Sequence, residues 1–229
     1  MTISVIIPVL NEVHALPNLI DYLLKISNPA CVSEIIVVDG GSTDGTQTVV
    51  EKYPQVTRVD SERGRALQMN RGAQIATSPI LYFLHCDTFP PQHYDAEIVK
   101  KVTAGNASGC FRMKFDSNHI VLKVSQWFTR FNHLSCRGGD QSLFVERTLF
   151  EQLGGFDEQL IIYEDNEFVA RLYKNSKFTV IQQSVTTSAR KYRENGVWTL
   201  QYHFMMIHFN YWRGDNQTQL CAYYKKHIK

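Results

Sequence analysis

Four acidic residues stand just after apolar segments of the sequence, where their side chains could carry out chemistry. Asp39 and Asp87 each follow a run of large or β-branched apolar residues, and Glu164 and Asp165 follow a third such run. A carboxylate at the end of a buried strand can accept hydrogen bonds from the base or ribose of a nucleotide. Asp87 is also a hard oxygen ligand of the kind that Mg²⁺ and Mn²⁺ prefer. These residues therefore predict a site for a nucleotide and a divalent metal.

Asp39 opens the stretch DGGSTDG, whose glycines would let a ligand approach the backbone closely. We interpret Ser42, Thr43 and Asp44 as turn or capping residues, with a helix beginning near position 43 or 44. Capping alone does not account for a carboxylate beside two glycines at a strand end. We therefore predict that Asp39 contacts a ligand.

Basic residues lie at the start of the next helical segment, 66–76. A helix N-terminus combined with guanidinium groups is suited to bind an anion such as a diphosphate. We keep Arg65 as a candidate ligand, whereas Arg71 is more simply interpreted as a solvated helical charge.

Two further features have alternative interpretations. His85, two positions before Asp87, is either a second metal ligand or a histidine satisfied within the core. Glu164, Asp165 and Glu167 begin a helical segment, where acidic side chains complement the helix dipole and contribute up to ~1 kcal/mol. A carboxylate pair at a helix start can also project into a cleft as a general base. Spacing alone does not decide between the two roles.

Short apolar runs alternate with helical patterns along most of the chain. We predict strands over 3–9, 35–38, 56–59, 80–84, 107–115, 141–145 and 178–181, and helices over 13–24, 66–76, 120–131, 165–174 and 197–212. This alternation predicts a single α/β domain with a mostly parallel, Rossmann-like sheet flanked by helices. We interpret 161–163 as a strand-like apolar run. Because ligands of such sheets bind at the carboxyl ends of the strands, Asp39 and Asp87 fall at the expected edge.

Composition argues against several classes of protein. The net charge of +2 is too small for a dedicated nucleic-acid-binding protein. Five scattered cysteines, never in C-x-x-C spacing, favour reduced intracellular thiols over a disulfide framework or a zinc ribbon. The sequence contains neither a signal peptide nor an apolar run of about 18 residues, so we expect a cytoplasmic protein. It also contains no G-x-S-x-G, Walker A or G-x-G-x-x-G motif.

In combination, these segments resemble the family 2 glycosyltransferases, which are inverting enzymes of the GT-A fold. The matching segments are SVIIPVLNE (4–12), IIVVDGGSTDG (35–45), HCDT (85–88) and the pair at 164–165. A narrower likeness is to a small bacterial subgroup described as associated with radical-SAM and selenium-domain genes. Motifs of that subgroup are similar to GRALQMN (64–70), GDQ (139–141) and SARKY (188–192).

The resemblance implies transfer of a sugar from a UDP- or GDP-sugar to an acceptor hydroxyl with inversion, assisted by Mg²⁺ or Mn²⁺. Asp165 would be the catalytic base, and Asp87 would be the metal ligand. The donor-binding residues would be Pro8, Leu10, Glu12, Asp39, Arg65, Gln68 and Asp87, and the acceptor-binding residues would be Gly139, Asp140, Gln141 and Glu164. His85 stands where the D-x-D element of the family has its first aspartate, which leaves one certain carboxylate for the metal.

The resemblance also divides the single domain, 1–229, into a donor half over about 1–105 and an acceptor half over about 106–229. The alternative is a non-catalytic nucleotide-sugar-binding protein of the same fold, which the replacement at His85 favours. A nucleotidyltransferase would carry a glycine-rich, basic loop after its first strand, where this chain has PVLNE (8–12).

Two helical segments carry apolar and aromatic stripes, 120–131 and 197–212, and the chain ends on the basic run 225–229. Such stripes usually pack on a sheet or on a second subunit, and we expect this of the first segment. For the second segment we leave two interpretations open, packing of that kind or contact with a lipid interface. In the lipid case the acceptor would be apolar-tailed or lipid-linked, and the protein would lie at the inner face of the membrane. If the second segment instead packs on a second subunit, the protein would be a homo-oligomer.

Overall fold

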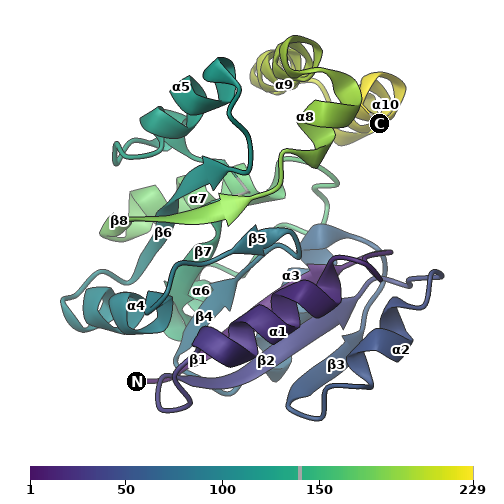
Figure 1. Cartoon of the computed structure of the whole chain (residues 1–229). Coiled ribbons are helices and arrows are strands. Elements are labelled where there is room, and N and C mark those ends of the chain that lie inside the picture. Colours follow the sequence, from purple (N-terminus) through teal and green to yellow (C-terminus); the bar gives the residue numbers. More distant parts are fainter. Residues whose placement is uncertain (139–140, 229) are drawn as a thin grey trace.

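An eight-stranded sheet runs through the molecule in the order β3-β2-β1-β4-β7-β6-β8-β5 (Figure 1). The structure is a computed structural model that describes residues 1–138 and 141–228, and all eight strands lie within them. The strands are β1 Ile3–Val9, β2 Val32–Asp39, β3 Val56–Asp60, β4 Ile80–Phe83, β5 Thr88–Phe89, β6 Ser108–Phe115, β7 Leu143–Glu146 and β8 Phe178–Thr187. The helices are α1 Leu16–Ile26, α2 Thr46–Val50, α3 Arg65–Ile75, α4 Tyr94–Thr103, α5 Ile120–Phe128, α6 Arg147–Gln152, α7 Glu164–Asn175, α8 Arg190–Asn195, α9 Val197–Trp212 and α10 Gln217–His227, with a 3₁₀ turn η1 at Leu134–Cys136.

Most strand pairs are parallel, as the sequence predicts. β1 is parallel to both β2 and β4, β2 is parallel to β3, and β6 is parallel to β8. β7 is antiparallel to β4 and β6, and the short β5 is antiparallel to β8. Because β1, β2 and β4 run in one direction, the loops that follow them meet at the same edge of the sheet.

Helices cover both faces of the sheet. α1 and α4 pack in one hydrophobic cluster, and α3, α6 and α7 pack in a second cluster on the opposite face. α1 buries Leu16, Leu19, Ile20 and Leu23 at helical spacing, and each such burial contributes roughly 1.5–3 kcal/mol. Its outward face is largely polar, as is usual for a surface helix.

The approach of α3 to the sheet depends on a glycine. A Cβ atom at Gly72 would lie 2.4 Å from Ile6 Cγ2 and 3.0 Å from Val38 Cγ2, so only glycine fits without a shift. The close packing brings the first turns of α3, with Arg65 and Gln68, to the carboxyl ends of β1 and β2.

A third region lies beyond β6 and β8. Figure 1 shows α5, α8, α9 and α10 together at the upper end of the molecule, away from α1 and α2. Leu122 of α5 packs with Phe115, Ala189 and Tyr192, while α9 and α10 form a separate small cluster around Leu200. Across the described ranges, no helix combines the length and apolar character that crossing a membrane requires.

Several elements differ from the predictions. α2 begins at Thr46 rather than near 43 or 44. Gly45, the residue before it, has a left-handed φ of 94°, so the helical backbone starts only after this glycine. The run 161–163 forms no strand, since Tyr163 turns with φ 79° into α7. β5, α4, α8 and α10 were not predicted. The capping box of Asn216 and Gln219 at the start of α10 was a readable signal.

The expected packing of α5 on the sheet is only partly met. Leu122 is the one buried apolar residue of this helix, and its aromatic stripe faces outward. β6 and the start of α8 meet α5 along one narrow face, which leaves the stripe without cover from the described part of the chain.

Candidate active site

The loops after β1 and β2 are joined side by side at the edge of the sheet. Asn11 N donates to Ser42 Oγ at 2.8 Å, and Asn11 Oδ1 accepts from Thr43 N at 2.8 Å. Glu12 N donates to Thr46 Oγ1 at 2.9 Å. Asn11 adopts φ 56°, in the left-handed region that asparagine tolerates better than most residues. The paired loops form a fixed rim around the end of β2.

Asp39 lies within this rim and is only 1% exposed. Its carboxylate accepts from Gln47 Nε2 at 2.7 Å, from the amides of Ser42 at 3.0 Å and Gly41 at 3.3 Å, and from the Ser42 hydroxyl. Burial acts to raise the pKa of Asp39, but the hydrogen bonds from Ser42, Gln47 and Gly41 outweigh burial and lower it. Asp39 is therefore a fixed negative charge at the end of β2. The interpretation of Ser42 as a turn residue is confirmed, whereas Gln47 gave no sequence signal.

Gln68 ties the ends of β1 and β2 together. Its side-chain Nε2 donates to Val9 O at 2.7 Å and to Val38 O at 2.8 Å. A Cβ atom at Gly40 would lie 2.9 Å from Gln68 Cδ, so the glycine makes room for this amide. Gln68 is 5% exposed, and its nitrogen is thus committed to positioning the strand ends.

Pro8 and Leu10, the remaining β1-side candidates for the donor, are half-buried at the same edge. Val9 O accepts from Gly40 N on the β2 side, and Ile6 O accepts from Leu84 N on the β4 side. Alternate residues of β1 therefore bond to opposite neighbours. The N–H that Pro8 lacks falls on the β4 side, beyond the last paired residue of β4, which explains how a central strand accommodates proline.

Asp87 lies opposite this rim, in the loop between β4 and β5. Its carbonyl oxygen accepts from Ser188 N at 3.2 Å, which joins this loop to the segment before α8. Arg190 of α8 donates from Nη2 to Glu12 Oε1 at 3.2 Å. The hydrogen bond to Glu12 is the largest cause that raises the pKa of Arg190, and the negative charge of Asp87 adds to it. A guanidinium thus lies between two carboxylates on the donor side.

Sequence reasoning gave Arg190 no role. The resemblance of 188–192 to a subgroup motif was the only signal. The contact between positions 12 and 190 depends on the tertiary fold.

The pair Glu164 and Asp165 lies at the N-terminus of α7, beside the end of β4. Arg65 Nη1 is 3.1 Å from Glu164 Oε1 and 3.3 Å from Asp165 Oδ2. His85 Nε2 lies 3.9 Å from Asp165 Oδ2. The side chain of Asp165 is 14% exposed, whereas Glu164 as a whole is 2% exposed. The structure therefore brings together four sequence candidates that are up to a hundred positions apart.

Glu164 differs from its neighbour in how far it is removed from water. Burial is the largest cause that raises the pKa of Glu164 to about 7, and the adjacent Asp165 raises it further. Arg65 opposes the shift but does not cancel it. Glu164 therefore gains and loses its proton near neutral pH, beside the carboxylate of Asp165.

Tyr163 joins this pair to α9. Its hydroxyl lies 2.9 Å from His208 Nδ1, and its ring stacks on Tyr211 with centroids 4.1 Å apart. Because Tyr163 directly precedes Glu164, the position of α9 bears on the start of α7. No pattern in the sequence predicted this contact.

The acceptor candidates of the loop before β7 are only partly placed. Gly139 and Asp140 lie outside the described residues. Gln141 is 3% exposed and turns inward, where Nε2 donates to Cys136 O at 2.8 Å. The structure does not bring its side chain to Asp165.

The described residues contain no group of three or more His, Cys, Asp or Glu side chains that could hold a metal ion. The D-x-D-like element supplies the carboxylate of Asp87, while His85 lies toward Asp165. Mg²⁺ and Mn²⁺ commonly take one or two carboxylates and complete their coordination with phosphate and water. Asp87 fits a cation that is held jointly with a diphosphate.

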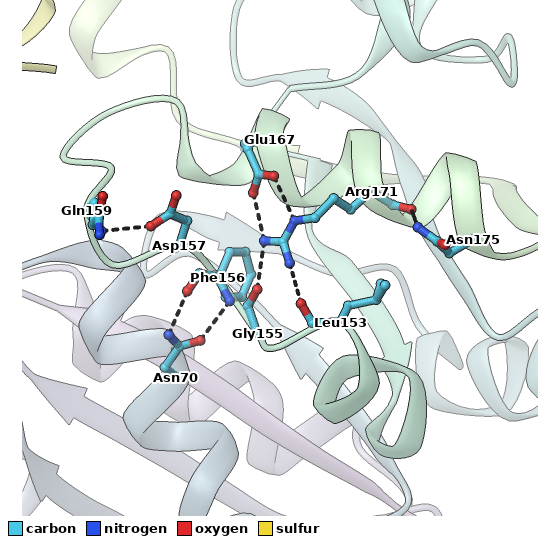
Figure 2. Close-up of polar contacts among 9 residues, drawn as sticks. All are labelled: Asn70, Leu153, Gly155, Phe156, Asp157, Gln159, Glu167, Arg171 and Asn175. Carbon is cyan, nitrogen blue, oxygen red and sulfur yellow. Dashed lines mark hydrogen bonds and ion pairs between the residues drawn. The ribbon is translucent and has the colours of Figure 1, made fainter. Parts of the chain in front are cut away.

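A cavity of about 680 Å³ opens elsewhere, between α3, α7 and the loop over 154–159. Figure 2 shows that its polar groups already pair with one another. Arg171 holds Glu167 through two hydrogen bonds of 2.7 Å and reaches the carbonyls of Leu153 and Gly155, and Asn70 binds the backbone of the same loop. This network fixes the loop that leads into α7, so we interpret the cavity as structural.

Comparison with known proteins identifies related sequences and folds. Residues 4–152 match the model of the family described as "Glycosyl transferase family 2". A PGL/p-HBAD biosynthesis glycosyltransferase of Mycobacterium bovis is 28% identical over 196 residues, which cover 75% of this chain and 70% of that protein. Glycosyltransferase AglE of Haloferax volcanii is 25% identical over 183 residues, which cover 74% of this chain and 60% of that protein.

Solved structures show the same fold. Mannosyltransferase PcManGT from Pyrobaculum calidifontis, in complex with GDP-Man and Mn²⁺, has a TM-score of 0.69 at 20% identity over 97% of this chain and 69% of that one. S. aureus TarS in complex with UDP has a TM-score of 0.68 at 20% identity over 82% of this chain and 61% of that one. The predicted GT-A fold is confirmed. This chain spans about 60–70% of the length of these relatives.

Proposed function

This chain belongs to glycosyl transferase family 2, and from that premise we propose that it transfers a sugar from a nucleotide-diphosphate sugar to an acceptor hydroxyl with inversion. The observation that carries the proposal is the contact of His85 with Asp165. It places the loop with Asp87, on the donor side, beside the carboxylate pair at the start of α7. In this arrangement, a leaving diphosphate at Asp87 and a proton acceptor at Asp165 would belong to one small region.

On the donor side, we assign the nucleoside to Asp39 and the diphosphate to the region between Asp87 and Arg190. The assignment rests on the position of Asp39 at the end of β2. Both of its carboxylate oxygens already accept from Ser42, Gln47 or Gly41, so a base or ribose would bind by replacing one of these donors. Support comes from PcManGT and TarS, which were solved with GDP-Man and with UDP, respectively. A divalent cation held by Asp87 would stabilise negative charge on the departing diphosphate.

On the acceptor side, we assign the general base to Asp165. In a single in-line displacement, the acceptor oxygen bonds to the anomeric carbon while the bond from that carbon to the diphosphate oxygen breaks. The proton of the hydroxyl passes to a carboxylate oxygen of Asp165, whose side chain is partly open to solvent. Arg65 Nη1, 3.3 Å from Asp165 Oδ2, holds that carboxylate in place.

The experiment compares wild type with Asp165→Asn, which keeps the shape of the side chain and removes its basicity. Calorimetry first selects the UDP- or GDP-sugar that binds, and release of nucleoside diphosphate then measures turnover, with water standing in for the acceptor. Turnover should fall about 10²–10⁴-fold while donor affinity stays near wild type. Near-normal turnover in Asp165→Asn would show that Asp165 is not the general base. Donor binding without turnover in wild type would favour a non-catalytic binding protein.

A further inference from the structure

α9 is apolar on two sides. Its inward side buries Leu200 and Ile207 against α10 and its neighbours. Its outward side carries five side chains that are 45–81% exposed and recur at intervals of three or four residues, namely Trp198, Tyr202, Met205, Phe209 and Trp212. An ordinary surface helix has polar residues in these positions. We call this set the α9 stripe.

α5 repeats the arrangement. Its one buried residue is Leu122, and an apolar row continues outward from the helix into the turn that follows it. The row consists of Ile120, Val124, Trp127, Phe128, Phe131 and Leu134, each 41–67% exposed. We call this set the α5 stripe. Leu122 shares a small cluster with Tyr192 and Val197, so the buried side of α5 and the first residue of α9 contribute to the same core.

The two stripes hold most of the exposed apolar side chains of the described residues. Eleven of the fourteen large apolar residues that are exposed there belong to the two stripes, although these span only thirty positions. All three tryptophans of the chain are among them. Contiguous exposed apolar surface marks an interaction site, and tryptophan and tyrosine are the residues that favour the boundary between lipid and water.

Cations border both stripes. The guanidinium of Arg130 lies 4.7 Å from the ring centre of Trp127, and that of Arg213 lies 5.8 Å from the ring centre of Phe209. Residues 190–228 contain six Lys or Arg against two Asp or Glu, and two of the six, Arg190 and Arg193, pair with Glu12 and Asp116 outside this segment. A two-fold contact with a second copy would bring these cations face to face, while an anionic surface would neutralise them.

We propose that the α5 and α9 stripes together form a docking surface for an anionic lipid bilayer. Aromatic side chains enter the interface, and the bordering cations attract the headgroups. α9 also holds Tyr163, the residue before the catalytic pair, so docking sets the pair close to the lipid surface. The docking surface itself does not depend on the proposed reaction.

The test uses vesicles of phosphatidylglycerol and phosphatidylcholine, with pure phosphatidylcholine vesicles for comparison. Wild type should co-sediment with the anionic vesicles at low salt and be released at high salt, because screening weakens headgroup attraction. Tryptophan emission should move to shorter wavelength on binding, since Trp127, Trp198 and Trp212 would leave water. Absence of both signals at low salt overturns the proposal.

Variants separate the surface from general stickiness. Phe209→Glu and Trp127→Glu each introduce a charge into one stripe and should abolish co-sedimentation, whereas Leu24→Glu, at an exposed position of α1, should bind like wild type. Removing one cation, by Lys123→Gln or Arg213→Gln, should weaken binding about fivefold. Equal loss with Leu24→Glu would contradict the assignment to these stripes.

Two further measurements distinguish this proposal from other outcomes. Sedimentation velocity without lipid should give a monomer. A dimer that dissociates in Phe209→Glu would show that the stripes bind a second copy of the chain and not a bilayer. Nucleotide binding, measured by calorimetry, should be unchanged in Phe209→Glu. If wild type bound a nucleotide but did not bind the anionic vesicles, the docking surface would be overturned and the proposed function would stand.

Discussion

Asp39 at the end of β2 and Glu164 at the start of α7 are both buried carboxylates, yet their pKa values shift in opposite directions. Asp39 receives hydrogen bonds from a side-chain amide, a hydroxyl and two backbone amides, and these lower its pKa despite burial. Glu164 has Arg65 as its cation and Asp165 as a like charge, and burial raises its pKa to about 7. Hydrogen bonds outweigh burial at Asp39, whereas at Glu164 burial and the like charge of Asp165 outweigh Arg65.

The difference assigns different chemistry to the two regions. A carboxylate that is charged throughout the working pH range suits the recognition of a nucleoside, because it accepts hydrogen bonds without changing state. A carboxyl group such as Glu164, which gains and loses a proton near pH 7, suits a region where a proton is transferred. The donor region is thus built for binding and the start of α7 for acid–base work.

Glu164→Gln should have the largest effect on this difference between Asp39 and Glu164, because glutamine mimics the protonated form of the glutamate. Because the folded pKa of about 7 lies above the ordinary value of 4.5, Glu164 stabilises the fold fully below about pH 4.5. That stability is lost as pH rises through 7, and the loss amounts to about 3 kcal/mol by linkage.

The glutamine variant should lack this loss, so its stability relative to wild type should increase between pH 5 and pH 8. Urea unfolding at a series of pH values measures the difference. Parallel curves for the two proteins would show that Glu164 is charged in the fold at neutral pH, and the contrast with Asp39 would disappear.

Gln68→Met sharpens the contrast from the donor side. The variant removes the Nε2 donor from the carbonyls of Val9 and Val38, at a position that is 5% exposed. Val9 O keeps its hydrogen bond from Gly40 N, so the loss of the side-chain donor should cost about 0.5–1.5 kcal/mol of stability. Nucleoside diphosphate binding should weaken as well, because the two strand ends are no longer tied. Gln74→Met, at an exposed position of the same helix, is the matched control and should change neither property.

Arg190→Gln tests the charge balance between Glu12 and Asp87 and has the smallest expected effect. Removing the guanidinium leaves two carboxylates facing an incoming diphosphate, so affinity should fall about tenfold, in keeping with one partly exposed charged contact. Arg193→Gln removes a cation of the same helix that pairs instead with Asp116, and it should leave affinity unchanged. Equal losses in the two variants would indicate a general effect of positive charge.

Elements with a regular apolar pattern were predicted closely from the sequence. β1 and α9 have the predicted bounds, and α3 begins one residue earlier and ends one residue earlier than expected. Buried strands and long helices carry their own signal, because each position along them faces the core or solvent in a fixed rhythm. α10 was missed although its capping box was readable, and α2 was misplaced because Gly45 governs where it begins.

Contacts between distant segments could not be predicted in this way. Glu12 meets Arg190, and Tyr163 meets His208, because of the strand order on the β7, β6 and β8 side of the sheet, where antiparallel and parallel pairs mix. The hydrophobic pattern of a sequence carries no information about the order of strands in a sheet. It also does not distinguish a helix with one apolar face from a helix with two. The sequence therefore showed apolar stripes in both segments, but only the structure shows that those of α5 and α9 are exposed.

The most direct test of the central claim is a calorimetric titration of UDP and GDP, with and without Mn²⁺, into wild type, Asp39→Ala and Asp87→Ala. Wild type should bind at least one of the two nucleotides, more tightly with Mn²⁺. Asp39→Ala should weaken binding under both conditions, and Asp87→Ala should lose only the increase due to Mn²⁺. No binding of either nucleotide to wild type, or full Mn²⁺-dependent binding in Asp87→Ala, would contradict the assignment of the donor site to this edge of the sheet.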